Sequence, residues 1–258
     1  LKYIHIYQII KKERITIGIT HVIKREYKMK IVKEIFRSYD IRGIYEKELT
    51  NDLAYLIGRA FATISKGKII VGHDARTSSN ALNTNFIKGA LKSGAEIIDI
   101  GLCTTPMLYY AREFFKEDYA VMITASHCAK EYNGFKLCDS NGSMYGDKIK
   151  DFLNLILSGN FKNGIGHVST YDLTFDYKKM IIKKITLGPR KIKAVVDCGN
   201  GTTCYFNPEI LKDLGVSVVP LYCEPDASFP NHIPDPAVES NMVALQEKVK
   251  EAGASVGI

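Results

Sequence analysis

Short apolar runs alternate with amphipathic segments along most of this chain. Runs of about five apolar residues bounded by Gly or polar residues are typical of buried strands. Longer stretches with apolar residues three or four positions apart lie between them and predict helices. The expected strands are residues 68–72, 96–100, 119–123, 193–197, 216–221 and 255–258. The expected helices are residues 80–93, 106–116, 146–157, 173–185 and 240–252, with another after CGNGTT.

Capping and turn residues mark where several of these elements begin. Ser78 or Ser79 is expected to cap the first predicted helix, and Ser240 to cap the last. Between residues 135 and 145, the turn DSNG separates two short runs and predicts a β-hairpin.

The regular alternation of strands and helices predicts an α/β fold. We expect two consecutive α/β domains with mixed, largely parallel sheets. The composition turns to Gly and Asn around residues 158–168, so we assign residues 31–162 to the first domain and 163–258 to the second. The last predicted strand ends where open α/β sheets place functional loops, so we expect the second domain to be incomplete and the sequence truncated.

The N-terminal segment differs in composition from the rest. Residues 1–30 hold eight Lys and Arg and only two Glu, so they carry six of the seven formal positive charges. We interpret them as a basic extension outside the fold, with Met29 as the working start. A genuine basic arm or first strand is the alternative, because KERITIGITHVI alternates in polarity.

The remaining composition narrows the class of protein. The body has a net charge of only about +1, which disfavours a nucleic-acid partner. No apolar run is long enough to cross a membrane. The six Cys form no C-x-x-C pair and are interpreted as free thiols, which favours a cytoplasmic location.

The densest group of reactive side chains lies in TASHCAKEYNGFK, after the predicted strand 119–123. It offers a hydroxyl nucleophile in Ser126, a titratable neighbour in His127 and a cation in Lys136. A serine needs a nearby base or cation to react, and a phosphoryl group in transfer needs positive charge around its oxygens. From spacing alone, a polar loop with a chance Ser-His pair stays open. A Ser-His hydrolase is disfavoured because no G-x-S-x-G elbow is present.

Four stretches in register resemble the α-D-phosphohexomutases. TASHxxxxYNGFK resembles that family's active-serine loop, and FRSYDIRG, VGHDARTSS and FPNHIPDP resemble three further family segments. The form YNGFK is similar to the phosphomannomutase/phosphoglucomutase branch, whereas phosphoglucosamine mutases tend to carry a DNGIK-like version.

The resemblance implies an isomerase that interconverts hexose 1-phosphates and 6-phosphates through a 1,6-bisphosphate. Ser126 would carry the phosphoryl group, with His127 and Lys136 assisting proton transfer and charge stabilisation. Tyr39 and Arg42 would face the serine, and Tyr39, Arg42 and Lys136 would bind the substrate, with Arg42 also counted among the catalytic residues. The Asp74–Arg76 pair and His232 are interpreted as structural.

The resemblance also implies Mg²⁺ on the Ser126 phosphate and a hexose 1,6-bisphosphate activator. The family's aspartate metal loop is absent from the sequence, as are its sugar-binding and phosphate-binding domains. The alternative to an active phosphohexomutase is therefore a catalytically incomplete fragment, or half of a split mutase completed by a second chain.

The serine loop also departs from the family pattern. Cys128-Ala129 stands where the family usually has Asn-Pro, which frees the loop backbone and removes a turn-forming side chain.

Overall fold

The computed structural model describes residues 31–258, of which 32–258 form one compact unit. The expectations for residues 1–30, including the start at Met29, lie outside the described residues. No helix in the described part of the chain is long and apolar enough to span a membrane.

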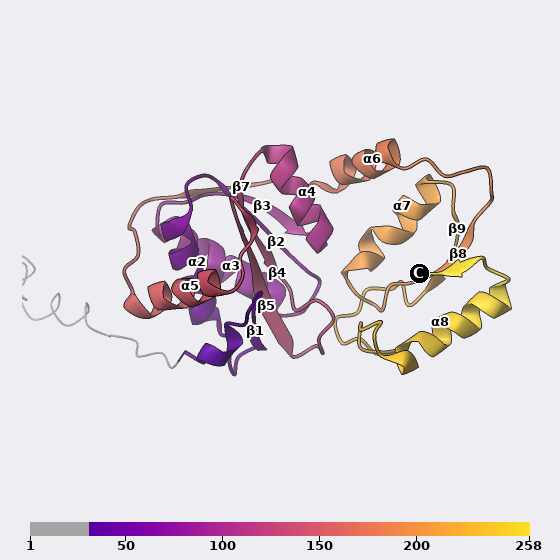
Figure 1. Ribbon diagram of the computed structural model, residues 1–258, viewed down its shortest axis with the longest axis horizontal. Coiled ribbons are helices and arrows are strands. Elements are labelled where there is room, and N and C mark those ends of the chain that lie inside the picture. The colour runs from indigo at the N-terminus through magenta and orange to yellow at the C-terminus, as the bar shows by residue number, and fades with distance from the viewer. Residues whose placement is uncertain (1–30) are drawn as a thin grey trace, which may run out of the picture. The chain divides into compact units, whose positions relative to one another are not determined.

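The larger sheet within residues 31–258 is mixed. Its strands are β1 (Ile41–Ile44), β2 (Ile69–His73), β3 (Glu96–Leu102), β4 (Tyr119–Ile123), β5 (Tyr132–Asp139), β6 (Gly142–Ser143) and β7 (His167–Thr170). They run in the order β1, β5, β4, β2, β3, β7, with β6 beside β5 (Figure 1). β4, β2, β3 and β7 are parallel, whereas β5 is antiparallel to its neighbours. The predicted α/β class is confirmed.

Helices cover both faces of this sheet. They are the 3₁₀ turn η1 (Lys33–Ile35), α2 (Asn51–Ile64), α3 (Ser79–Lys92), α4 (Thr105–Phe115) and α5 (Asp147–Ser158). On one face, Phe61 of α2 contacts Phe86 of α3 and Tyr119 of β4, with ring centroids 6.2 and 6.1 Å apart. On the other face, Met107 and Leu108 of α4 are buried in a separate apolar cluster. The sheet is therefore a central layer whose inner strands are buried on both sides.

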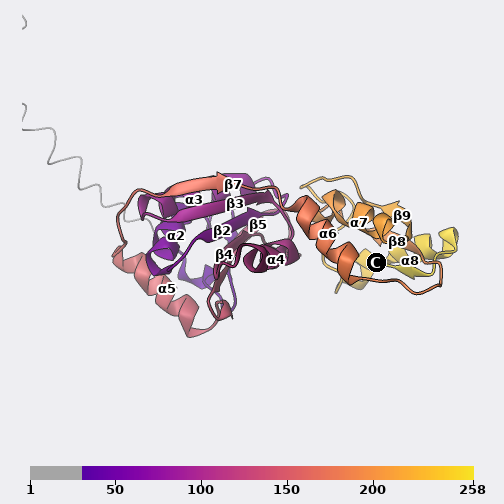
Figure 2. The same ribbon diagram turned by 90° about the horizontal axis from the view of Figure 1, so that it is seen from above.

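A smaller parallel sheet follows in the order β10, β8, β9. Its strands are β8 (Lys193–Asp197), β9 (Ser217–Leu221) and β10 (Val256–Gly257), and its helices are α6 (Thr174–Lys184), η2 (Thr202–Tyr205), α7 (Asn207–Asp213) and α8 (Glu239–Ala252). α6 and α7 lie side by side (Figure 2), and an ion pair between Lys178 and Glu209 joins them. Phe206 and Ile210 are buried in the apolar cluster of α4, which ties this part to the first.

The larger sheet continues past the boundary that we placed at residue 162. β7 pairs in parallel with β3, from His167 opposite Glu96 to Thr170 opposite Asp99. All four β7 residues are exposed, so backbone hydrogen bonds rather than apolar burial hold this edge strand. Because β7 has no run of buried apolar residues, the sequence pattern did not predict this strand.

Two expected helix caps are corrected by the structure. Ser78 occupies the N-cap position of α3, but its hydroxyl accepts a hydrogen bond from the Asn133 amide at 2.8 Å instead of capping the helix. α8 begins at Glu239 after Val238, so Ser240 lies inside the helix. Asn241 donates to two carbonyl oxygens of the preceding loop and thereby anchors the start of α8.

α2 and α3 meet at a pair of glycines. A Cβ atom on Gly58 would overlap the Phe86 carbonyl, and one on Gly89 would overlap the Tyr55 carbonyl. Each glycine thus allows the other helix's backbone to approach, which no larger residue permits without displacement.

Gly58→Ala is expected to lower the free energy of unfolding by at least about 2 kcal/mol, because the added methyl group forces the helices apart. Urea unfolding followed by circular dichroism measures this. Gly188→Ala is the matched control: a Cβ there meets nothing within 4 Å, so its effect should stay within about 0.5 kcal/mol. Equal effects of the two substitutions would contradict the role of the glycine contact.

Candidate active site

Ser126 lies just beyond the C-terminal end of β4, in a strained turn. Its φ is 56°, in the left-handed region that residues with a side chain rarely adopt. Its N–H donates to the Thr124 hydroxyl at 2.9 Å, which fixes this conformation. Its Oγ lies 3.3 Å from Nδ1 of His127, and both side chains belong to exposed residues. The structure thus brings together the predicted nucleophile and its predicted proton partner.

The buried guanidinium of Arg76 supports the backbone of the serine loop. Arg76, on the turn between β2 and α3, forms an ion pair with Asp74 at 3.2 Å. Its other hydrogen bonds, of 2.7–3.1 Å, go to the backbone carbonyls of Ser126, Cys128, Ala129 and Tyr132. The predicted Asp74–Arg76 pair is confirmed, and it also acts as the frame on which the active loop rests.

Asp74 distributes its charge over several donors. Its carboxylate accepts from the Thr124 hydroxyl at 2.7 Å, from the Ser79 hydroxyl and from Arg76. Burial lowers the pKa of Arg76, and the attraction of Asp74 opposes this shift. A buried cation of this kind is stable only while its carboxylate and carbonyl partners remain in place.

Two of the predicted cations share one carboxylate. Arg42 donates to Asp40 at 2.6 Å, and the Lys136 ammonium lies 3.5 Å from the same carboxylate oxygen. Arg42 also donates to the Cys128 sulfur at 3.2 Å, which places it against the serine loop. Burial alone lowers the pKa of Arg42, but Asp40 and Cys128 together raise it above its ordinary value.

Asp40 was not singled out from the sequence, although it lies in the FRSYDIRG stretch beside Arg42. The antiparallel pairing of β1 with β5 brings Asp40 and Arg42 close to Lys136, 94 or more residues away along the chain. Tyr39, by contrast, is 76% exposed and does not line the cleft described below. Its expected orientation toward the serine stays a prediction.

A cleft of about 540 Å³ opens beside the serine loop. Ser126, His127 and Arg76 line one side, and Asp197, Phe229 and His232 line the other. Arg42 and Lys136 are not part of its lining, so these cations approach the loop from elsewhere than the cleft. A substrate in this cleft would reach the serine hydroxyl directly.

Two contacts connect the serine frame with the second half of the chain. The N–H of Ala75 donates to the Thr202 hydroxyl at 2.9 Å. The Arg76 guanidinium lies over the ring of Phe229, 5.2 Å from its centroid. The turn that supports the serine is therefore itself packed against the loop before α8.

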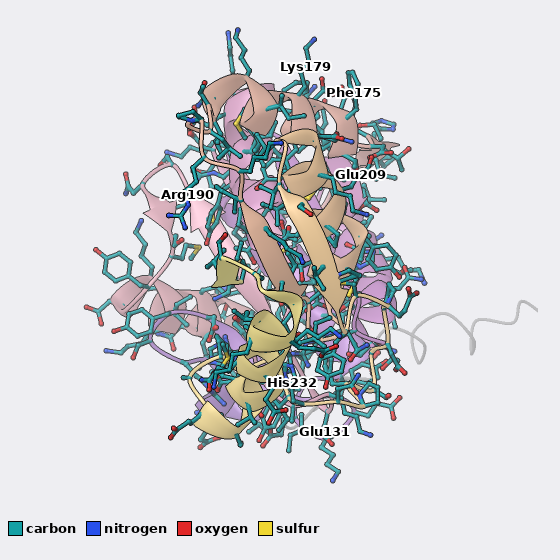
Figure 3. All side chains as sticks on the ribbon, turned by 90° about the vertical axis from the view of Figure 1, so that its right-hand side faces the viewer. Glu131, Phe175, Lys179, Arg190, Glu209 and His232 are labelled. Carbon is teal, nitrogen blue, oxygen red and sulfur yellow. The ribbon has the colours of Figure 1, made fainter. Side chains whose placement is uncertain are left out.

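His232 is fixed at both ring nitrogens. Nε2 lies 3.0 Å from an Asp197 carboxylate oxygen, and Nδ1 lies 2.9 Å from the Ile233 carbonyl. Its ring meets Tyr222 edge-on at 5.6 Å. Figure 3 shows it on the loop near α8. These contacts agree with the expectation that His232 is structural.

Among residues 31–258, no group of three or more His, Cys, Asp or Glu could hold a metal ion. The carboxylate that supports the serine loop, Asp74, is engaged by Arg76 and two hydroxyls. The described residues therefore do not fit a complete metal centre.

Two segments of the chain match models of protein domains. Residues 33–162 match the model of phosphoglucomutase/phosphomannomutase α/β/α domain I, and residues 175–258 match that of domain II. The chain belongs to the phosphoglucomutase/phosphomannomutase family. All the predicted site residues lie within the domain I match, and their individual roles remain predictions.

Three curated proteins are similar to this chain over most of its length. A phosphomannomutase/phosphoglucomutase of Pseudomonas putida is 39% identical over 228 residues, covering 87% of this chain and 49% of the relative. A Neisseria meningitidis phosphoglucomutase is 37% identical, covering 88% and 51%. A probable phosphoglucosamine mutase of Methanosphaera stadtmanae is 35% identical, covering 89% and 53%.

A solved phosphoglucomutase/phosphomannomutase family structure from Burkholderia thailandensis has the same fold. It superposes with a TM-score of 0.83 at 33% identity, covering 88% of this chain and 52% of that one. The chain spans about half the length of the curated relatives it matches. Family membership suggests a metal cofactor.

Arg76→Met is expected to lower the free energy of unfolding by about 3–5 kcal/mol, because it leaves the Asp74 carboxylate buried without its cation. Chemical denaturation measures the change, and hydrogen exchange of residues 124–132 should rise at the same time. Arg190→Met, the same change at an exposed residue, is the control and should have an effect within about 0.5 kcal/mol. Unchanged exchange in a destabilised Arg76 variant would contradict the framing role.

Proposed function

We propose that this chain provides the phosphoryl-carrying part of a phosphohexomutase that interconverts hexose 1-phosphate and 6-phosphate. The observation that supports this most directly is the exposed Ser126 on a rigidly framed turn beside a cleft, with Arg42 held against the same loop. A hydroxyl presented in this way suits group transfer, because positioning and charge stabilisation supply most of the catalysis in phosphoryl transfer.

In the proposed reaction, the phosphorylated Ser126 gives its phosphoryl group to the free hydroxyl of a hexose phosphate. The Oγ–P bond breaks, a new bond forms between phosphorus and the sugar oxygen, and the sugar hydroxyl loses its proton. The resulting 1,6-bisphosphate turns over, and its other phosphoryl group returns to Ser126. His127, 3.3 Å from Oγ, is placed to exchange the proton of the serine hydroxyl.

The cations have a separate role in this proposal. Arg42 offers a planar fork of N–H donors that suits phosphate oxygens. Lys136 adds a second positive charge, and Asp40 holds both side chains close to the loop. We propose Arg42, Lys136 and Tyr39 as the residues that meet the substrate phosphate.

The substrate class follows from the family and the serine loop. We propose phosphosugars of the mannose and glucose series, because relatives named phosphomannomutase/phosphoglucomutase share this chain's family domains and YNGFK matches that branch. Mg²⁺ and a hexose 1,6-bisphosphate activator belong to the same proposal. The metal would contact the Ser126 phosphate, but the described residues do not complete its site, and no step above depends on it.

The alternative is a chain that holds the phosphoserine but does not complete the cycle. Coverage of about half of each relative fits this alternative without favouring it. The possible second chain finds no support in the comparisons. The expected cytoplasmic location and the absence of a nucleic-acid partner also stay predictions.

Ser126→Ala is expected to abolish conversion of mannose 1-phosphate or glucose 1-phosphate, because the variant lacks the hydroxyl that is proposed to carry the phosphoryl group. Phosphorus NMR of the 258-residue chain with Mg²⁺ and glucose 1,6-bisphosphate measures this, with exposed Ser140→Ala as the control. Failure of the folded wild-type chain to convert either sugar would contradict mutase activity of this chain and favour the incomplete alternative.

Asp40→Asn is expected to slow phosphorylation of Ser126 by glucose 1,6-bisphosphate about tenfold to a hundredfold, because Arg42 and Lys136 lose the carboxylate that positions them. Intact-protein mass spectrometry follows the added phosphate without requiring the full cycle. The control is Asp139→Asn. Asp139 lies on β5, the strand that carries Lys136, and the substitution breaks its ion pair with Lys148, which should leave the rate of phosphorylation unchanged. Similar losses in both variants would point to β5 as a whole and refute the specific role of Asp40.

A further inference from the structure

Three cysteines from separate segments meet at the C-terminal edge of the smaller sheet. Cys198 follows β8, Cys204 lies in η2 and Cys223 follows β9. All are free thiols. The sulfurs of Cys198 and Cys223 are 3.5 Å apart, and Cys204 is hydrogen-bonded to Cys198. We call these residues the thiol cluster.

The thiols of the cluster are hydrogen-bonded to one another and to the backbone around them. Cys223 donates to the Cys198 sulfur at 3.5 Å, and Cys204 donates to the Tyr222 carbonyl at 3.6 Å. Donation from Cys198 lowers the pKa of Cys204, whereas burial raises the pKa of Cys223 to about 11. Of the three, Cys204 is therefore the thiol best suited to exist as thiolate.

The three thiols differ in their exposure to solvent, which decides whether an oxidant can reach them. Cys198 is buried at 6% exposure, whereas Cys204 and Cys223 are partly exposed. An oxidant in solvent can therefore reach Cys204 and Cys223, whereas Cys198 is covered and contacts both of them. Sulfurs 3.5 Å apart need to approach by about 1.5 Å to reach the disulfide bond length of about 2.05 Å.

We propose that the thiol cluster is a hydroperoxide-sensitive modification site, in which Cys204 is oxidised first and the final product is a disulfide between Cys198 and Cys223. The oxidant is hydrogen peroxide or a related hydroperoxide. This chemistry is independent of phosphoryl transfer at Ser126.

Each step balances. The Cys204 thiolate attacks one oxygen of hydrogen peroxide, so an S–O bond forms, the O–O bond breaks and hydroxide leaves. The Cys198 thiol attacks the Cys204 sulfur, and water leaves as an S–S bond replaces the S–O bond. Cys223 then attacks the Cys198 sulfur and displaces Cys204, which regains a proton. Cys204 is the better leaving group because its pKa is the lower.

The product would join the two loops that support the far wall of the cleft. Asn200 donates from its backbone N–H to the Tyr222 carbonyl and from its side chain to the Glu224 carbonyl. Its side-chain oxygen also accepts from Asn231, beside His232. A covalent bond between Cys198 and Cys223 would make this hydrogen-bonded connection permanent until a reductant opens it.

The test is peroxide oxidation of the full chain, followed by thiol blocking and peptide mass spectrometry. Wild type is expected to lose two thiols and to show the Cys198–Cys223 bond, which dithiothreitol reverses. Cys223→Ser should stop at a Cys198–Cys204 bond. Cys204→Ser should slow disulfide formation at least about tenfold, and the rate in wild type should reach its plateau below the ordinary thiol pKa of about 8.5.

Cys128→Ser is the matched control, a partly exposed cysteine outside the cluster, and should oxidise like wild type. Cys204→Ala serves as a second variant, and circular dichroism verifies that each variant is folded. Retention of all six thiols, first oxidation at Cys128, or an unchanged rate in both Cys204 variants would overturn the proposal.

Discussion

The burial of one positive charge, on Arg76, constrains the rest of the site. A guanidinium removed from water must be surrounded by acceptors, and here these are the Asp74 carboxylate and the carbonyls of the serine loop. The dependence is mutual, because the guanidinium uses the loop carbonyls as acceptors and those carbonyls use the guanidinium as their donor. The strained φ of Ser126 persists because this network over-determines it.

Asp40 balances part of the positive charge near the serine loop. Arg42 and Lys136 lie close enough to repel one another, and their shared carboxylate offsets that repulsion. The group of Asp40, Arg42 and Lys136 then carries a net charge of about +1 at neutral pH.

The strands most easily predicted from the sequence are those buried on both faces. Residues 119–123 are all buried, and their apolar run marks β4 without ambiguity. β7 is exposed and held by backbone pairing, so it carries no apolar signal. α2 does carry one, because Leu53, Ile57 and Phe61 are buried at helical spacing, but no helix was assigned to these residues from the sequence. The sequence of the serine loop was enough to predict the candidate nucleophile, its titratable neighbour and a nearby cation. The bridging role of Asp40 was not, because it depends on pairing between strands that lie far apart in the chain.

Arg76 recognises the serine loop through main-chain oxygens, which every amino acid supplies. The loop can therefore accept sequence drift at positions such as Cys128 and Ala129 without losing its support, since neither side chain takes part in that recognition. Arg76 would therefore find the same two carbonyl oxygens if other side chains stood at these positions. The support depends instead on the arginine, whose five N–H donors no other side chain supplies.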